Sequence, residues 1–193
     1  MNAGITGHQD LGSPARTAWV RETLRYLIEA YRVTHGLTCL AAGADQLYAE
    51  LLTSRGIPYT PILPCRRYEE AFADACAREW FNRLLSAAPK IVWLDFDRPS
   101  QAAFFEAGKE VVDRSDLLFA VWDGQAARGI GGTADVVAYA LSRGKPIVHL
   151  NPATDEVLKI PQAAGVSQVS NIGVCMEIHL ELTEGGTHLL RRF

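Results

Sequence analysis

The stretch LLFAVW at residues 117–122 is apolar throughout, and the glycine-rich stretch DGQAARGIGGTAD follows it directly at residues 123–135. A short run without polar residues is typical of a central strand in a parallel sheet, because helices cover both faces of such a sheet. Residues 133–143 have helical periodicity, and Gly144 follows as a stop signal. A buried strand, a glycine loop and a helix in this order predict an α/β fold.

The same alternation extends through residues 1–150. Strand-like apolar runs occur at 1–6, 37–41, 59–63, 91–94 and 146–150, and amphipathic stretches lie between them, the longest at about 68–87. Ser13 and Ser100 are suited to cap the helices that follow them. We therefore predict a Rossmann-like, doubly wound and mostly parallel six-stranded sheet with helices on both faces. Its ligand site is expected at the carboxyl ends of the strands.

Residues 151–193 have a different pattern. Residues 151–170 are small and polar without a strong period, which predicts a linker. Apolar residues then occupy alternate positions from Val174 to Leu182, which predicts a half-buried antiparallel strand. A turn at 184–186 and a return strand at 187–193 complete a predicted C-terminal β-hairpin. We expect this extension to lengthen a sheet edge or to form a dimer contact.

The composition excludes several classes of protein. The chain has 193 residues, 48% of them hydrophobic, and a net charge of −3, which predicts a globular protein. Because phosphate backbones are bound through basic faces, we do not expect nucleic acid as a partner. The apolar runs are too short for a membrane span, and the N-terminus lacks a signal-peptide pattern. The four cysteines match no zinc spacing and indicate reduced thiols, so a cytoplasmic location without a membrane partner is expected.

Glycine-containing loops follow two of the early strands. Gly7 lets the backbone approach a ligand closely, with polar groups from its neighbours Thr6 and His8. The loop at 41–45 joins a strand to a helix N-terminus, where free N–H groups and the helix dipole favour an anion. Its candidate residues are Gly43, Ala44 and Asp45. The Asp45 carboxylate either complements the helix dipole or accepts hydrogen bonds from ribose hydroxyls or a base amino group.

The glycine loop after residue 122 is the strongest candidate, because it follows the central strand and opens a helix. Its bare backbone and the Thr133 hydroxyl, which can also cap the helix, form a cradle for a phosphate. The loop is neither the dinucleotide fingerprint nor a Walker loop. Trp122 is suited either to stack on a base or to close the core. The predicted ligand-binding residues of this loop are Asp123, Arg128, Gly129, Gly131, Gly132, Thr133 and Asp135.

The motifs at 4–8 (GITGH), 42–45 (AGAD) and 131–135 (GGTAD) resemble those of the SLOG superfamily, which includes the LOG and Smf/DprA proteins. The resemblance covers about residues 1–150 and implies a Rossmann-like domain, a pocket for nucleotides or their derivatives, and a homodimer. The LOG branch hydrolyses the N-glycosidic bond of cytokinin riboside monophosphates. Here Asp135 and Val136 stand where that branch has two glutamates, and Gln9 stands where close relatives have an arginine.

Three functions remain open on this basis. The first is a nucleotide-binding module of the sensor or effector type. The second is an N-glycosidase that releases the base from a nucleoside monophosphate, with Asp135 and Asp45 as its catalytic carboxylates. The third is a partner-binding structural domain that works through the C-terminal hairpin. We expect no cofactor, and no residue spacing indicates a metal site.

Overall fold

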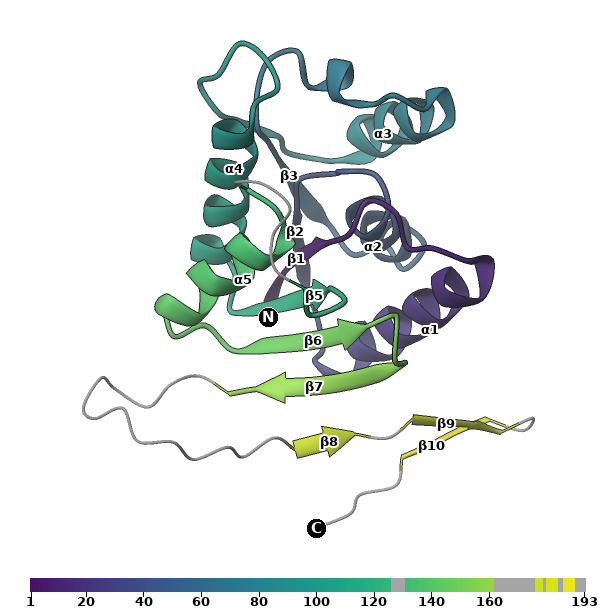
Figure 1. Cartoon of the computed structure of the whole chain (residues 1–193). Coiled ribbons are helices and arrows are strands. Elements are labelled where there is room, and N and C mark those ends of the chain that lie inside the picture. Colours follow the sequence, from purple (N-terminus) through teal and green to yellow (C-terminus); the bar gives the residue numbers. More distant parts are fainter. Residues whose placement is uncertain (126–130, 162–175, 179, 184–185, 190–193) are drawn as a thin grey trace.

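The computed structural model describes residues 1–125, 131–161, 176–178, 180–183 and 186–189. Its centre is a sheet with the strand order β4-β3-β2-β1-β5-β6-β7-β8 (Figure 1). The strands are β1 (Asn2–Gly7), β2 (His35–Thr38), β3 (Tyr59–Leu63), β4 (Val92–Trp93), β5 (Leu117–Val121), β6 (Ile147–Asn151), β7 (Glu156–Ile160) and β8 (Met176–Ile178). The chain builds outward from β1 in both directions, so the neighbours β1 and β5 form the topological switch point of the sheet.

The six predicted strands all form, and every pair among them is parallel. Strands β3 and β5 are buried along their whole length, as the apolar runs predicted. Gly7 at the end of β1 is in register with Val121 at the end of β5. The loops that follow these two strands therefore start at the same level, and the Rossmann-like prediction is confirmed.

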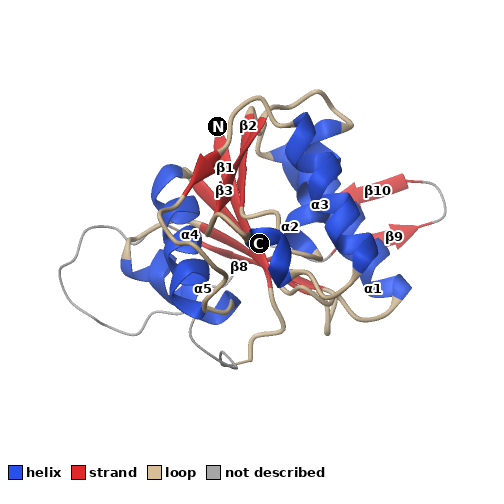
Figure 2. Ribbon diagram, turned by 90° about the horizontal axis from the view of Figure 1, so that it is seen from above, coloured by secondary structure: helices blue, strands red, loops and turns tan. Residues whose placement is uncertain are grey.

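Helices cover both faces of the sheet (Figures 1 and 2). They are α1 (Pro14–Ala30), α2 (Ala44–Thr53), α3 (Ala75–Ala87), α4 (Gln101–Arg114) and α5 (Thr133–Ser142). Helices α1 to α3 share one apolar core with Phe119 of β5, whereas α4 and α5 share another with Leu118 and Ala120. One strand serves both cores because its successive side chains point to opposite faces.

The stretch at 68–87, predicted as one helix, forms two elements. A short 3-10 helix, η1, spans Tyr68–Ala71, and α3 begins only at Ala75. Asp74 separates them, since its carboxylate accepts hydrogen bonds from the backbone N–H groups of Cys76 and Ala77 at 3.3 and 3.0 Å. The backbone is already extended at Phe72, where η1 ends, and Asp74 is the N-cap from which α3 begins. The predicted caps Ser13 and Ser100 also accept N–H groups of α1 and α4.

The prediction of six strands and of a linker at 151–170 is wrong where β7 forms. Residues 156–160 pair antiparallel with β6, and β8 pairs antiparallel with β7. A tight turn at 152–155, with Asp155 at a φ of 57°, reverses the chain between β6 and β7. The sequence of β7 has little strand periodicity. The strand forms because it pairs with the edge of β6.

A C-terminal hairpin forms as predicted from strands β9 (Leu180–Thr183) and β10 (Gly186–Leu189), which pair antiparallel. We expected the Rossmann-like domain to end at residue 150, and β6, the last of its parallel strands, ends at Asn151. That residues 151–193 act as a separate extension remains a prediction. None of the described helices is both long enough and apolar enough to cross a membrane.

Candidate functional site

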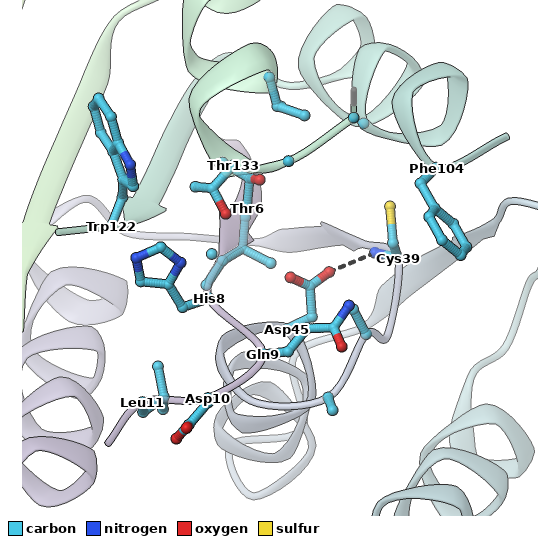
Figure 3. A pocket seen from close by; sticks show the side chains of 18 of the residues that line it. Thr6, His8, Gln9, Asp10, Leu11, Cys39, Asp45, Phe104, Trp122 and Thr133 are labelled. Atoms are coloured by element: carbon cyan, nitrogen blue, oxygen red, sulfur yellow. Dashed lines mark hydrogen bonds between the residues drawn. The ribbon is translucent and has the colours of Figure 1, made fainter. Parts of the chain in front are cut away.

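A cavity of about 580 Å³ lies at the carboxyl ends of the parallel strands, where the loops after β1, β2, β3, β5 and β6 meet. This volume is in the range of small-molecule sites, and the cavity includes the switch point between β1 and β5. His8 and Trp122 lie on one side of it, Cys39 and Phe104 lie on the other, and Thr6 and Thr133 lie between them (Figure 3).

The N-terminus of α5 is open to this cavity. Gly132 is the N-cap of α5, which no described side chain caps, and Thr133 is its first helical residue. Thr133 therefore does not cap the helix as predicted. Its hydroxyl, like that of Thr6, has no hydrogen-bond partner in the described parts of the chain. Gly132, Thr133 and Ala134 all line the cavity, so unpaired N–H groups and two hydroxyls face one space.

Asp135 has a different environment from the one predicted. Its carboxylate accepts the backbone N–H of Gly131 at 2.7 Å, and it is not among the residues that line the cavity. Gly131 has a φ of 87°, and a Cβ there would lie 2.6 Å from the Gln101 carbonyl oxygen. Asp135 and Gly131 thus shape the loop before α5 and hold it against α4.

The predicted anion site at Gly43 and Ala44 is filled by the protein itself. The backbone N–H of Ala44 donates to the carbonyl oxygen of His8 at 3.1 Å. Gly43 has a φ of 77°, and a Cβ there would lie 2.4 Å from the Gln9 carbonyl oxygen. Neither residue lines the cavity. The loop after β1 crosses over this helix N-terminus and takes the place that an anion would occupy.

Asp45, by contrast, lines the cavity and is almost fully buried. Its carboxylate accepts hydrogen bonds from the Thr38 hydroxyl at 2.9 Å and from the Cys39 backbone N–H at 2.8 Å. Burial raises the pKa of Asp45 to about 7, although these bonds and one from the Ala41 N–H oppose the rise. A carboxyl group that exchanges its proton near neutral pH therefore forms part of the cavity wall.

His8 connects the loops after β1 and β5. Its Nε2 atom lies 3.2 Å from both the backbone nitrogen and the Oδ1 atom of Asp123. A neutral imidazole can accept the Asp123 N–H, and an imidazolium can donate to the carboxylate, so the contact is favourable in both charge states. The Asp123 carboxylate also accepts the Gln125 N–H at 3.0 Å. His8 and Asp123 both line the cavity, as predicted.

Trp122 contacts both the core and the cavity. Its indole N–H donates to the Gln125 carbonyl oxygen at 2.8 Å, and its ring centroid lies 5.4 Å from that of His149. The ring is half-buried and lines the cavity. Because the backbone and His149 hold the indole in place, it can offer a fixed flat surface.

Sequence reasoning missed Arg16. The guanidinium belongs to the first turn of α1, and Arg16 is the one lysine or arginine among the described residues that line the cavity. It supplies a cation on the side of the cavity where Gln9 replaces the arginine expected from the family resemblance. Arg16 lies outside the glycine loops in the sequence, so the motifs do not indicate it. It reaches the cavity because α1 begins shortly after Gly12, which also lines the cavity.

An aromatic group on the other side of the cavity was also missed. Tyr68, Phe72 and Phe104 line it, with ring centroids of Tyr68 at 5.3 Å from Phe72 and 6.1 Å from Phe104. Their positions at helical spacing suggested only core packing. We call these three residues the aromatic wall.

Two predicted residues, Arg128 and Gly129, lie outside the described residues. The remaining predicted ligand contacts that line the cavity are Thr6, Gly7, His8, Asp45, Asp123, Gly131, Gly132 and Thr133. Within the described ranges, no group of three histidine, cysteine or acidic residues is placed to hold a metal ion.

Solved structures share this fold. DNA processing protein A (DprA) from Streptococcus pneumoniae has a TM-score of 0.57 and 10% identity, over 77% of this chain and 49% of that chain. DprA from Helicobacter pylori has a TM-score of 0.57 and 17% identity, over 77% and 64%. The molybdenum cofactor binding protein from Rippkaea orientalis has a TM-score of 0.52 and 19% identity, over 78% and 76%.

The chain thus spans only 49% of the length of one DprA structure and 64% of the other. No protein-family model and no curated protein matches the sequence. The structural likenesses show that the chain shares the Rossmann-like fold of these proteins.

These likenesses also correct one expectation. The H. pylori structure is described as showing a single-stranded DNA binding mode, and the fold is shared with this chain. The exclusion of nucleic acid as a partner is therefore wrong. It rested on net charge, which sums over the whole chain and does not report how charge is distributed around one site.

Proposed function

We propose that the cavity binds a nucleotide or a nucleotide-derived small molecule, and that the domain is a sensor or effector module. The observation that carries this proposal is the uncapped N-terminus of α5, which opens onto the cavity together with the free hydroxyls of Thr6 and Thr133. Unpaired N–H groups at a helix N-terminus and hydroxyl donors suit the oxygens of a phosphate.

The charges around the cavity are compatible with an anion at this point. The carboxylates of Asp10 and Asp123 accept backbone N–H groups of Gly12 and Gln125, which stabilises their charge within their own loops. Arg16 supplies a positive charge at the same cavity. Because the phosphate of a nucleotide occupies only one end of the ligand, the rest of the cavity remains for the ribose and the base.

The first test is a thermal-shift screen with nucleoside mono-, di- and triphosphates, NAD, ADP-ribose, cyclic nucleotides and a short single-stranded DNA. A ligand at 100 times its Kd adds about 2.7 kcal/mol to the free energy of unfolding. For a chain of this length we expect Tm to rise by roughly 5–10 °C. If none of these compounds raises Tm, the proposal is wrong.

The variant Thr133→Val tests where the phosphate binds, because it removes the hydroxyl and keeps the branched shape. A hydrogen bond to a charged group is lost, so we expect the affinity for the best nucleotide to fall by about 10-fold or more. Thr53→Val is the control, since Thr53 lies at the end of α2 and donates to the Ala49 carbonyl oxygen. An equal loss in both variants would exclude a specific role for Thr133.

A second candidate function is hydrolysis of the N-glycosidic bond of a nucleoside monophosphate. The observation that favours it is Asp45, a carboxyl group in the cavity wall with a pKa of about 7. In this reaction the C1′–N bond breaks, and the leaving base takes the bonding electrons and a proton. Water supplies a hydroxyl to C1′, and its other proton restores the carboxyl group that protonated the base. A carboxyl group that is partly protonated at neutral pH can supply the proton.

Release of free base from each nucleotide that binds can be followed by chromatography. For a hydrolase, Asp45→Asn should abolish base release and keep nucleotide binding, because an amide cannot transfer the proton. Asp135→Asn should weaken both base release and nucleotide binding. The effect is indirect, because Asp135 accepts the Gly131 N–H in the loop before α5 and does not line the cavity. If no bound nucleotide releases base, only the binding function remains.

A further inference from the structure

Tyr68 is held rigidly at the cavity. It is 4% exposed, and its ring meets those of Phe72 and Phe81 edge-on, with centroids 5.3 and 5.5 Å away. The Phe104 ring lies 6.1 Å away on α4. These contacts come from α3, from α4 and from the residue that follows η1, so packing sets the orientation of the ring.

The hydroxyl of this buried ring has no hydrogen-bond partner among the described residues. The other two buried tyrosines differ in this respect. Tyr48 donates to the Ala3 carbonyl oxygen at 3.0 Å, and Tyr59 donates to the Leu84 carbonyl oxygen at 2.6 Å. The Tyr68 oxygen is not among the described side-chain atoms that are fully buried without a partner, so it is open to the cavity that this residue lines. An unpaired hydroxyl on a residue that lines a cavity therefore points to a ligand atom as its partner.

The chemistry of this hydroxyl is that of a donor. Burial raises the pKa of Tyr68 well above its usual value, and the nearby Cys39, Asp45 and Cys65 raise it further. The phenol is therefore protonated at neutral pH. Its proton is available to an acceptor in the cavity, on the side where Tyr68 packs against Phe104.

We propose that the aromatic wall receives the heterocyclic base of the nucleotide and that the Tyr68 hydroxyl donates a hydrogen bond to an acceptor on the edge of that base. Phe72 and Phe104 are half-buried and line the cavity, so they supply flat apolar surface for a ring. The charged end of the ligand then lies at Thr133 and the N-terminus of α5. This inference rests on the proposed function, whose ligand it divides into a phosphate end and a base end.

The test compares AMP with ribose 5-phosphate, which has the phosphate and sugar but no base. We expect full-length protein to bind AMP roughly 5- to 150-fold more tightly, because base stacking on aromatic rings contributes in this range. Tyr68→Phe should weaken AMP binding by about 2- to 12-fold and leave ribose 5-phosphate binding unchanged. Calorimetry measures both affinities.

Tyr59→Phe is the matched control, since it removes the hydroxyl of a second buried tyrosine that bonds to the protein. It should lower the unfolding midpoint and leave the ratio of the two affinities unchanged, whereas Tyr68→Phe should not lower the midpoint. Equal binding of AMP and ribose 5-phosphate, or an unchanged AMP affinity in Tyr68→Phe, would overturn the base site alone. Binding of neither probe would overturn the proposed function and the base site with it.

Discussion

Asp45 serves the fold and the cavity at once. Its carboxylate collects donors from the end of β2 and from the loop that follows, so it orders the start of α2. The same burial that makes these bonds strong penalises the negative charge. Folding therefore raises the pKa of Asp45, whereas folding usually lowers the pKa of a hydrogen-bonded carboxyl group.

This pKa makes stability depend on pH. The folded state holds the Asp45 proton up to about pH 7, whereas the unfolded chain releases it near 3.8. The contribution of Asp45 is therefore fully present below the unfolded pKa and is lost as pH rises through the folded pKa. Between pH 5 and pH 8 we expect wild-type protein to lose about 1–3 kcal/mol more of its free energy of unfolding than Asp45→Asn.

Urea unfolding of both proteins at several pH values measures this difference. Asp116→Asn provides the control, because Asp116 is exposed and accepts the Asn2 N–H at the opposite end of the sheet. A pH dependence that is identical in wild type and Asp45→Asn would show that Asp45 is ionised normally.

Gly43 is required where two loops cross. The substitution Gly43→Ala places a Cβ 2.4 Å from the Gln9 carbonyl oxygen, at a φ of 77° that favours glycine. Gly144→Ala is matched to it, because Gly144 has a φ of 65° and open space around the new Cβ. We expect Gly43→Ala to lower the free energy of unfolding by about 1–3 kcal/mol more than Gly144→Ala. Chemical denaturation measures both, and equal losses would mean that the crossing can relax.

At the scale of elements, the two helices that begin beside the cavity have different roles. The N-terminus of α2 is used by the protein, because the Ala44 N–H donates to His8. The N-terminus of α5 is not used in this way, and Thr133 faces the cavity (Figure 3). Both sequences contain a glycine before the helix and an aspartate in its first turn. The difference depends on the loop after β1, which reaches one helix and not the other.

Asp74 caps the start of α3, after η1 has ended at Ala71. Asp74→Ala removes the acceptor for two N–H groups at the start of α3, so we expect a loss of about 1 kcal/mol in the free energy of unfolding. Asp74→Asn should retain most of the stability, because asparagine also caps helices well. Equal stability of Asp74→Ala and wild type in urea unfolding would show that packing alone fixes the start of α3.

At the scale of the molecule, the cavity is assembled from segments far apart in the sequence. Its described lining runs from Ile5 to Ala153 and comes from both apolar cores. None of the described lining residues lies beyond Ala153. We therefore expect the site and the C-terminal region to be separable.

Deletion of residues 171–193 tests this separation. We expect the affinity for the best nucleotide to change by less than about twofold, since the described cavity residues are all retained. If the expected homodimer forms through the hairpin, light scattering should report a monomer after the deletion. A large loss of affinity in a truncated protein that still unfolds cooperatively would place part of the site beyond residue 170.

Local patterns in the sequence were sufficient for much of the fold. The apolar runs predicted all six parallel strands, since a strand buried on both faces must be apolar along its length. Ser13 and Ser100 predicted helix starts, because capping depends on neighbours within three residues. The glycine loop after residue 122 predicted the place of the cavity, since the carboxyl end of a central parallel strand is the usual ligand position.

Long-range contacts decided the rest. Strand β7 exists because β6 offers an unpaired edge, and Gly43 and Ala44 are occupied because the loop after β1 crosses over them. Arg16 and Tyr68 reach the cavity only through the packing of α1 and η1 against the sheet. The sequence by itself determined the six parallel strands and the five main helices, because those depend on residues near one another in the chain. Which side chains meet in the cavity depends on how separate elements pack, and only the tertiary structure decided that.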